Sequence, residues 1–199
     1  MPKIDHEERK AQIVKECIRL FARLGYAAVN FGMIAKNVGI SRTLLYTYFT
    51  NKREIFNAAI DGVTSQVEAK YAEVVRARRQ SADTKLRQIC LTVFAMLADN
   101  RDFVCVIADV LASYRRKGAI PVERVDAHTV GVKRIIRSLV TEAVRRGEYG
   151  RRVNPARVAK LLYSQFEAFA LRLVVTGRAE LSECIDQLDV ILKALSARA

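Results

Sequence analysis

The sequence contains few of the residues that interrupt helices, and this scarcity narrows the fold class. Only 3 of its 199 residues are proline and only 9 are glycine. A fold of many short strands needs turn residues between the strands, so this composition favours long helices. No stretch shows convincing strand-like alternation, and no internal repeat is present. We therefore expect an all-α protein with about nine helices.

Several functional classes lack the residues that they require. No uninterrupted apolar run reaches 18 residues, so no transmembrane helix is expected. The phosphate-loop, dinucleotide-binding, nucleophile-elbow and zinc-protease motifs are also missing. Only two histidines occur, His6 and His128, which are too few for a typical metal site or catalytic triad. We expect no enzymatic activity, no cofactor and no metal.

Cysteine usage and the first residues point to the cytoplasm. The four cysteines lie among apolar residues and form no C-x-x-C pair. We interpret them as reduced core thiols of a cytosolic protein, with redox sensing as the alternative. The first ten residues, MPKIDHEERK, are charged, so we expect no signal peptide.

Positive charge is in large excess and suggests a polyanionic partner. The formal net charge is +13 and the isoelectric point is about 9.9. Such a balance is typical of proteins that bind nucleic acid or, less often, anionic membranes. A membrane-surface protein would concentrate its cations on one amphipathic helix, whereas here they are spread along the chain. Double-stranded DNA is therefore the preferred partner.

The first 50 residues predict a helix-turn-helix. Apolar residues at helical spacing indicate helices at about 7–24, 31–38 and 42–49. Gly25 suits the end of the first helix, and Asn30 and Ser41 suit the N-caps of the second and third. Gly39 allows a tight turn between the second and third helices. This pattern is typical of DNA-binding domains whose second motif helix enters the major groove.

A helical wheel divides the third predicted helix into an anchoring face and an exposed face. Leu45 and Phe49 are four residues apart and should anchor the helix on the first two. Thr43 and Thr47 lie on the opposite face, with Leu44 beside them. We expect the two threonines to meet base edges, where a hydroxyl can donate or accept and a methyl can contact thymine.

Residues at the borders of this face suit contacts to guanine or to phosphate. Arg42 has the reach for a guanine edge or a phosphate. Tyr46 and Tyr48 can pack their rings on the domain while their hydroxyls reach phosphate oxygens. We expect the fourth helix to begin at Asn51, its capping residue, and to run to about residue 78. Lys52 is then the first residue inside this helix. A cation there is unfavourable beside the positive helix end, so a bound phosphate would remove the conflict.

The stretch GYAAVNFGMIAKNVGISRTLLYTYFTNKREIF resembles the N-terminal signature of the TetR family of bacterial transcriptional regulators. The matching pieces are Gly25-Tyr26, Ile34-Ala35, Gly39-Ile40-Ser41, Leu45-Tyr46, Tyr48-Phe49 and Asn51-Lys52. The resemblance implies a homodimer that binds a palindromic operator, usually as a repressor released by a small molecule. It also implies that the third helix reads DNA and that Tyr46, Tyr48 and Lys52 contact phosphates.

Two positions depart from the family pattern. Leu44 stands where members often carry a hydroxyl that binds phosphate, so an apolar contact to a thymine methyl is expected instead. Asn30 stands where threonine or serine is common, and we include it among the expected DNA contacts. Gly32 weakens the second helix by roughly 1 kcal/mol relative to alanine.

The remaining sequence predicts a second, helical domain. Residues 1–52 form the expected DNA-binding domain, and residues 53–199 form the expected effector-binding and dimerisation domain. Further helices are expected at about 83–98, 102–116 and 121–146. Two more are expected, one from Pro155 to Thr176 with Asn154 as its N-cap, and a last one to about residue 196 with Ser182 as its N-cap. Apolar stripes on the last two helices suggest a dimer seam, with burial in the chain's own core as the alternative. The seam residues are Leu162, Phe166, Leu173, Leu181, Ile185, Leu188, Leu192 and Leu195.

The middle helices carry candidates for an apolar effector pocket, for which ordinary core is the alternative. A pocket with a few polar groups would take a largely hydrophobic small molecule. Its expected residues are Phe94, Met96, Phe103, Ile107, Leu111, Tyr114, His128 and Phe169. The predicted function is thus a sequence-specific, DNA-binding transcriptional regulator. The alternative is a non-enzymatic helical protein that binds anionic membranes or a protein partner.

Overall fold

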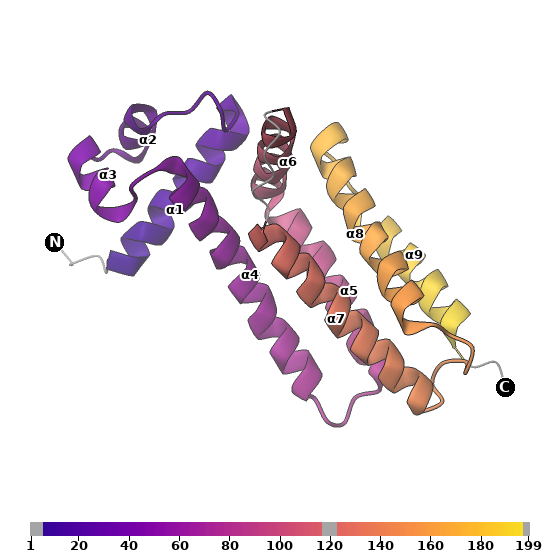
Figure 1. The fold of residues 1–199 in the computed structure, drawn as a ribbon. Coiled ribbons are helices and arrows are strands. Elements are labelled where there is room, and N and C mark those ends of the chain that lie inside the picture. The colour runs from indigo at the N-terminus through magenta and orange to yellow at the C-terminus, as the bar shows by residue number, and fades with distance from the viewer. Residues whose placement is uncertain (1–5, 117–122, 197–199) are drawn as a thin grey trace. The chain divides into compact units, whose positions relative to one another are not determined.

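A computed structural model describes the backbone of residues 6–116 and 123–196, and the side chains of 6–113 and 129–196. Regular structure in these ranges consists of nine α-helices, as predicted (Figure 1). The helices are α1 (His6–Leu24), α2 (Phe31–Val38), α3 (Arg42–Tyr48), α4 (Lys52–Arg76), α5 (Ala82–Asp99), α6 (Arg101–Arg116), α7 (Glu123–Arg145), α8 (Pro155–Thr176) and α9 (Leu181–Leu195). The expected helix start at Pro121 lies outside the described residues.

Packing groups the helices into two compact units, which we call the head unit and the bundle unit. The head unit comprises residues 1–63 and 101–124, so α6 belongs with α1, α2 and α3. The bundle unit comprises residues 64–100 and 125–199. Helix α4 contributes to both units. The functional division expected between residues 52 and 53 remains a prediction.

Aromatic side chains link the helices of the head unit. The ring centroids of Phe21 and Tyr26 are 5.1 Å apart, and those of Tyr26 and Phe56 are 5.8 Å apart. Phe56 in turn lies 6.5 Å from Phe103 of α6. All four rings are buried. Because large rings remove much apolar surface from water, this chain of contacts holds α1, α4 and α6 around one core.

The loop after α1 is fixed to α6 by a long-range hydrogen bond. Gly25 adopts a left-handed φ of +80°, which favours glycine, and its N–H donates to the Phe21 carbonyl at 2.8 Å. The next N–H, of Tyr26, donates to Asp109 Oδ2 at 2.7 Å. The carboxylate of α6 therefore determines where the chain goes after α1 ends.

The core of the bundle unit is built around α5. Helix α5 packs against both α8 and α9. The ring of Phe94 on α5 meets those of Phe166 and Phe169 on α8 edge to face, with centroids 5.0 and 5.4 Å away. All three rings are buried. Burial of this apolar surface supplies the main favourable term for folding the unit.

Polar contacts fix the ends of the bundle helices. Glu148, in the loop between α7 and α8, accepts from the N–H groups of Ala82 and Asp83 at 3.1 and 2.8 Å. A carboxylate is favourable there because the first N–H groups of a helix lack partners inside the helix. Arg87 of α5 makes a bidentate contact with Asp189 of α9, with both N–O distances 3.0 Å.

Three of the four cysteines are buried, as expected of core thiols. Cys17, Cys90 and Cys184 are buried, and Cys105 is half-buried. Burial raises the pKa of the Cys17 and Cys90 thiols to about 12. These two groups are therefore unreactive thiols at neutral pH. No described helix combines the length and the apolar character needed to cross a membrane.

Candidate nucleic-acid interface

Helix α3 is held to the head unit by one face only. Leu45 has no exposed surface, and Phe49, just after the helix, is 3% exposed. The two are four residues apart, so both lie on the face that packs against the domain. The anchoring pair predicted from the wheel is therefore found in the structure. The opposite face of α3 is left free.

Local chemistry defines both ends of the turn that precedes α3. Gly39 adopts a φ of +73°, and its N–H donates to the Ala35 carbonyl to end α2. Ser41 then caps α3, because its Oγ accepts from the Leu44 N–H at 3.0 Å. The predicted roles of Gly39 and Ser41 are both present. They fix the position at which α3 leaves the domain.

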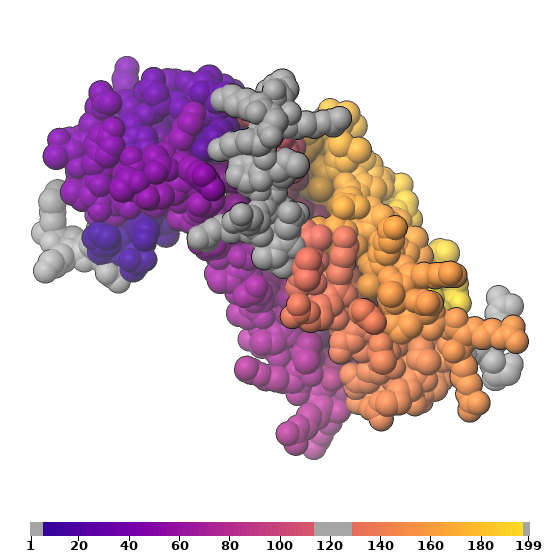
Figure 2. Space-filling model, viewed as in Figure 1, coloured from indigo at the N-terminus to yellow at the C-terminus, as the bar shows by residue number. Residues whose placement is uncertain are grey.

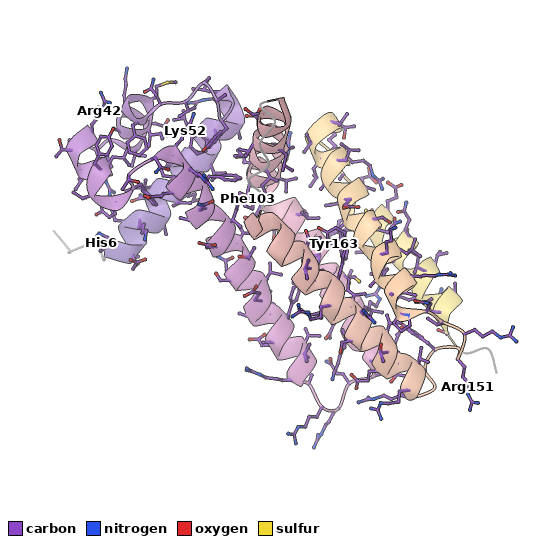
Figure 3. The ribbon with its side chains drawn as sticks, viewed as in Figure 1. His6, Arg42, Lys52, Phe103, Arg151 and Tyr163 are labelled. Carbon is purple, nitrogen blue, oxygen red and sulfur yellow. The ribbon has the colours of Figure 1, made fainter. Side chains whose placement is uncertain are left out.

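The exposed face of α3 carries a cationic, two hydroxyl-bearing and one apolar side chain. Arg42, Thr43, Leu44 and Thr47 are all exposed, and Figure 3 shows Arg42 on this helix. The Thr47 hydroxyl donates to the Leu44 carbonyl at 2.7 Å, so its proton is used inside the helix. Its oxygen and methyl remain available to a ligand. Leu44 is 42% exposed and offers an apolar surface.

The two tyrosines pack their rings against other parts of the head unit. The Tyr46 ring lies 4.9 Å from that of Phe31 on α2, while the residue stays 51% exposed. Tyr48 is half-buried and stacks on His6 at the start of α1, with ring centroids 4.6 Å apart. Sequence reasoning missed His6, because nothing in the local pattern shows that α1 begins beside the end of α3.

Asn30 is committed to capping α2 through its side-chain oxygen. Asn30 Oδ1 accepts from the Met33 N–H at 3.0 Å. A Cβ placed on Gly32 would lie 3.2 Å from this oxygen, so glycine leaves room for the cap. This clearance gives a local reason for a residue that otherwise weakens α2. Asn30 as a whole is exposed.

The contacts of Lys52 differ from those expected of a phosphate ligand. Its ammonium group donates to the carbonyls of Tyr26, Ala27 and Val29 at 2.7, 3.1 and 3.0 Å. The same nitrogen lies 4.6 Å from the centroid of the Tyr26 ring. An ammonium has three protons, so these carbonyls use its donor capacity. In this structure Lys52 therefore positions the loop between α1 and α2, and its contact with a phosphate remains a prediction.

The start of α4 is closed by a second cluster of hydrogen bonds. Asn51 Oδ1 accepts from the Glu54 N–H at 3.0 Å, which is the expected cap. Glu54 turns back to Thr50, accepting from its N–H at 2.7 Å and from its hydroxyl at 2.6 Å. The hydroxyl and the backbone N–H of Thr50 both hold the pKa of Glu54 below its usual value. The carboxylate also complements the positive end of α4.

The predicted dimer seam is largely part of the bundle unit's own core. Five of its residues are at most 5% exposed, and the other three are half-buried. The wheel identified the apolar faces of α8 and α9 correctly, but both faces are covered by the chain itself. The buried five are Leu162, Phe166, Leu173, Leu188 and Leu192, and the half-buried three are Leu181, Ile185 and Leu195. The five buried residues therefore fit the alternative interpretation, in which the apolar stripes of α8 and α9 pack in the chain's own core.

A different face of α8 and α9 exposes apolar side chains. Leu161, Leu171, Val175 and Val190 are 45%, 62%, 71% and 68% exposed. A groove of about 470 Å³ adjoins two of them, Leu161 and Val190. It is lined by Leu161, Gln165, Asp186, Gln187, Val190 and Ile191. We call these exposed side chains and the groove the α8–α9 strip. Their apolar character was readable from the sequence, but their exposure was not.

The expected effector-pocket residues are divided between the two units. Phe94 and Phe169 are buried and Met96 is half-buried in the bundle unit. Phe103 is buried, Ile107 is half-buried and Leu111 is 38% exposed in the head unit. The side chains of Tyr114 and His128 lie outside the described residues. A pocket formed by the whole set remains a prediction. Among the described side chains, no group of three or more potential ligands is arranged to hold a metal ion.

A protein family and two sequence relatives each match part of the chain. Residues 13–59 match the family described as bacterial regulatory proteins, tetR family. The uncharacterized HTH-type transcriptional regulator YerO of Bacillus subtilis is 30% identical over 102 residues, covering 50% of this chain and 35% of that protein. The nucleoid occlusion factor SlmA of Haemophilus ducreyi is 30% identical over 101 residues, covering 50% of each chain. The chain thus spans half or less of these relatives' length.

The fold as a whole also has solved counterparts. A TetR transcription regulator from Haloarcula marismortui superposes with a TM-score of 0.80 at 16% identity, covering 96% of this chain and 100% of the other. At that identity the likeness concerns the fold. Residues 13–59 are thus similar to the bacterial regulatory proteins of the tetR family, and the fold of the described residues is similar to that of a solved TetR regulator.

Proposed function

We propose that the chain is a sequence-specific DNA-binding transcriptional regulator that reads the major groove with α3. The observation that carries this proposal is the division of α3 into one buried anchor, Leu45, and an exposed opposite face. A helix held in this way presents its free side chains to base edges. Such a protein acts on the chromosome in the cytoplasm and regulates rather than catalyses.

The exposed residues have distinct proposed roles. Arg42 contacts a guanine edge or a phosphate. Thr43 and Thr47 meet base edges, with the Thr47 oxygen acting as an acceptor because its proton is engaged at 2.7 Å. Leu44 contacts a thymine methyl. These contacts specify sequence, whereas contacts to phosphate fix the orientation of the head unit on the duplex.

Three other residues suit the sugar-phosphate backbone. Tyr46 and Tyr48 have packed rings and can direct their hydroxyls to phosphate oxygens. The amide group of the exposed Asn30 can donate to a third phosphate while its oxygen caps α2. Lys52 supports these contacts indirectly by holding the loop that leads to Asn30.

The proposed reading roles predict different defects in two variants. Thr47→Ala should relax the preference at one base position and leave the others intact. Tyr46→Phe should weaken binding to all sequences alike, because it removes a phosphate contact without touching a base. Competition among duplexes that differ at single positions measures both effects. Equal loss of specificity in the two variants would count against these roles.

We further propose that the protein is a homodimer that assembles through the α8–α9 strip and binds a palindromic operator. Four apolar side chains between 45% and 71% exposed lie on these two helices. Two helices from each chain can form a four-helix bundle about a two-fold axis. Two head units could then meet half-sites spaced by one helical turn, about 34 Å.

We also propose that a small molecule controls DNA binding from the core of the bundle unit. The Tyr71 hydroxyl is buried there and has no hydrogen-bond partner among the described residues. Burial raises the pKa of this phenol well above its usual range, so it stays a neutral donor. Leaving such a group unpaired costs about 1–3 kcal/mol. A largely hydrophobic effector with one acceptor oxygen would satisfy it.

The surroundings of Tyr71 fit such a molecule. Phe94, Phe166 and Phe169 belong to the same apolar core. Tyr163 packs against that core, and its hydroxyl pairs with Thr129 at 2.7 Å. An effector in this region would act on α4, which carries Tyr71 and begins next to α3. Release of the operator by the effector would make the protein a repressor.

A further inference from the structure

A cluster of exposed arginines at one end of the bundle unit has no role in the function proposed above. Three of them lie at the end of α4 and in the loop that follows, and three lie at the end of α7 and in its following loop. We call these six the arginine cluster: Arg76, Arg78, Arg79, Arg145, Arg151 and Arg152. The α4–α5 loop (magenta) and the α7–α8 loop (orange) both project at this end in Figure 2.

The two loops are held together, so the six side chains share one surface. The Arg146 guanidinium donates to the Gln80 carbonyl at 3.4 Å, which joins the end of α7 to the α4–α5 loop. Glu148 accepts from the first N–H groups of α5, at Ala82 and Asp83. The Tyr149 hydroxyl donates to Asp83 at 2.7 Å. Figure 3 shows Arg151 on the outer side of this tied structure.

Two carboxylates at this end, Glu142 and Glu148, are already engaged by groups outside the arginine cluster. Glu142 pairs with Arg146, and Glu148 caps α5 while lying 3.9 Å from Arg146. None of the six cluster arginines forms an ion pair or a side-chain hydrogen bond with another described residue. Six like charges on one surface repel each other and disfavour the compact state. A bound polyanion would remove that repulsion.

The choice of arginine indicates the chemistry of the ligand. The guanidinium group is planar and always charged, and it makes bidentate contacts to phosphate or carboxylate. The cluster segments expose only one large apolar residue, Val75, at 47%. The core of a protein–protein interface is depleted in charged residues, so this surface does not resemble one. A polyanion that binds through charge alone fits better.

We propose that the arginine cluster is a second, sequence-independent contact for the phosphate backbone of duplex DNA, separate from α3. Duplex DNA carries one negative charge per about 1.7 Å of its axis, a density that a compact group of guanidinium groups matches. A regulator with both surfaces holds DNA by sequence at the head unit and by charge at the bundle unit.

The test uses the full chain and a short duplex without an operator. In a variant with Thr43→Glu and Thr47→Glu, the exposed face of α3 is made repulsive to phosphate, so remaining DNA binding reports on the cluster. Binding is measured by fluorescence anisotropy between about 50 mM and about 200 mM salt. We expect this variant to keep salt-dependent binding.

Adding Arg151→Gln with Arg152→Gln to that variant should reduce the slope of log affinity against log salt by about 2. The matched control is Arg134→Gln with Arg137→Gln, which removes the same charge from exposed positions on α7. The control should leave the slope unchanged. An equal reduction in both would show that net charge, not the cluster, is responsible, and the proposal would be wrong.

Two further outcomes overturn the proposal. One is the absence of duplex binding at low salt in the α3 variant. The other is a cluster with a different ligand. In that case the protein binds phosphatidylserine vesicles or a polyglutamate peptide, and Arg151→Gln with Arg152→Gln leaves the salt dependence of duplex binding unchanged. Failure of the proposed function is distinguishable, because it would abolish sequence preference in the wild type and leave the effect of Arg151→Gln with Arg152→Gln intact.

Discussion

The Nζ atom of Lys52 lies 2.7 Å from the carbonyl oxygen of Tyr26, and its charge sits 4.6 Å from the centroid of the Tyr26 ring. This contact joins the first residue of α4 to the loop after α1. The adjacent N–H of Tyr26 is bound in turn by Asp109 of α6 at 2.7 Å. The loop is therefore held from two sides, and the start of α2 depends on both contacts.

Replacing Lys52 by alanine should destabilise the head unit, because its ammonium group holds three carbonyls of the loop after α1. Hydrogen bonds to a charged group are worth more than neutral ones, so we expect a loss of about 2 kcal/mol in the free energy of unfolding. DNA affinity should fall for all sequences with little change in salt slope. Urea unfolding and salt titrations measure the two effects. Unchanged stability with a slope reduced by about 1 would instead favour the predicted phosphate contact over the positioning role.

The exposed cation Lys36 on α2 provides a control for this substitution. Lys36→Ala removes the same charge without a carbonyl cluster to disturb. Its free energy of unfolding should stay within about 0.5 kcal/mol of the wild type.

Glu54 should make stability depend on pH at the start of α4. Hydrogen bonds from Thr50 lower its pKa in the folded state below the ordinary value of 4.5. The unfolded chain therefore binds this proton first, and the stabilisation is present above pH 4.5. This stabilisation is lost as the pH falls through the pKa of Glu54 in the folded state, which is lower than the pKa in the unfolded chain. Glu54→Gln should be less stable than the wild type at neutral pH, and the difference should shrink in acid. Parallel pH profiles of the two unfolding midpoints would contradict this.

The α8–α9 strip predicts opposite outcomes for exposed and buried substitutions. Leu171→Glu with Val175→Glu, at positions 62% and 71% exposed, should give folded monomers with weak operator binding. Leu188→Glu, at a position 2% exposed, should instead unfold the bundle unit. Sedimentation and circular dichroism separate the two results. Val130→Glu, exposed on α7, is the control that should stay dimeric. A dimer that survives the double substitution would place the interface elsewhere.

Removing the Tyr71 hydroxyl should cost the protein nothing by itself. Tyr71→Phe deletes a buried hydroxyl that has no hydrogen-bond partner among the described residues, so stability should stay equal or rise. Tyr149→Phe is the contrasting control, because its hydroxyl donates to Asp83 and its loss should cost about 1 kcal/mol. Compounds found by thermal shift that carry an acceptor should bind Tyr71→Phe about tenfold more weakly. Unchanged affinity for every such compound would exclude Tyr71 as the anchor.

Features that depend on neighbouring residues were predictable from the sequence. The pair Leu45 and Phe49 follows from helical spacing, and the roles of Gly39 and Ser41 follow from their backbone preferences. Each of these contacts spans at most a few residues. Helix boundaries followed for the same reason, although α9 begins at Leu181 without the expected Ser182 cap.

Features that depend on distant residues were not predictable. Lys52 finds its carbonyl partners 23 to 26 residues earlier in the chain, and Asp109 reaches Tyr26 across 83 residues. A helical wheel shows which face of a helix is apolar but not what covers it. The apolar stripe of the last helix therefore predicts a dimer contact at Leu188, whereas Leu188 lies in the chain's own core.

Selection of bound duplexes from a random pool tests the central claim, that α3 reads DNA, most directly. The wild type should enrich an inverted repeat whose half-sites lie about one helical turn apart, roughly 34 Å. The variant with Thr43→Glu and Thr47→Glu should enrich no sequence. A pool that stays random with the wild type, or the same enriched motif from both proteins, would contradict the account.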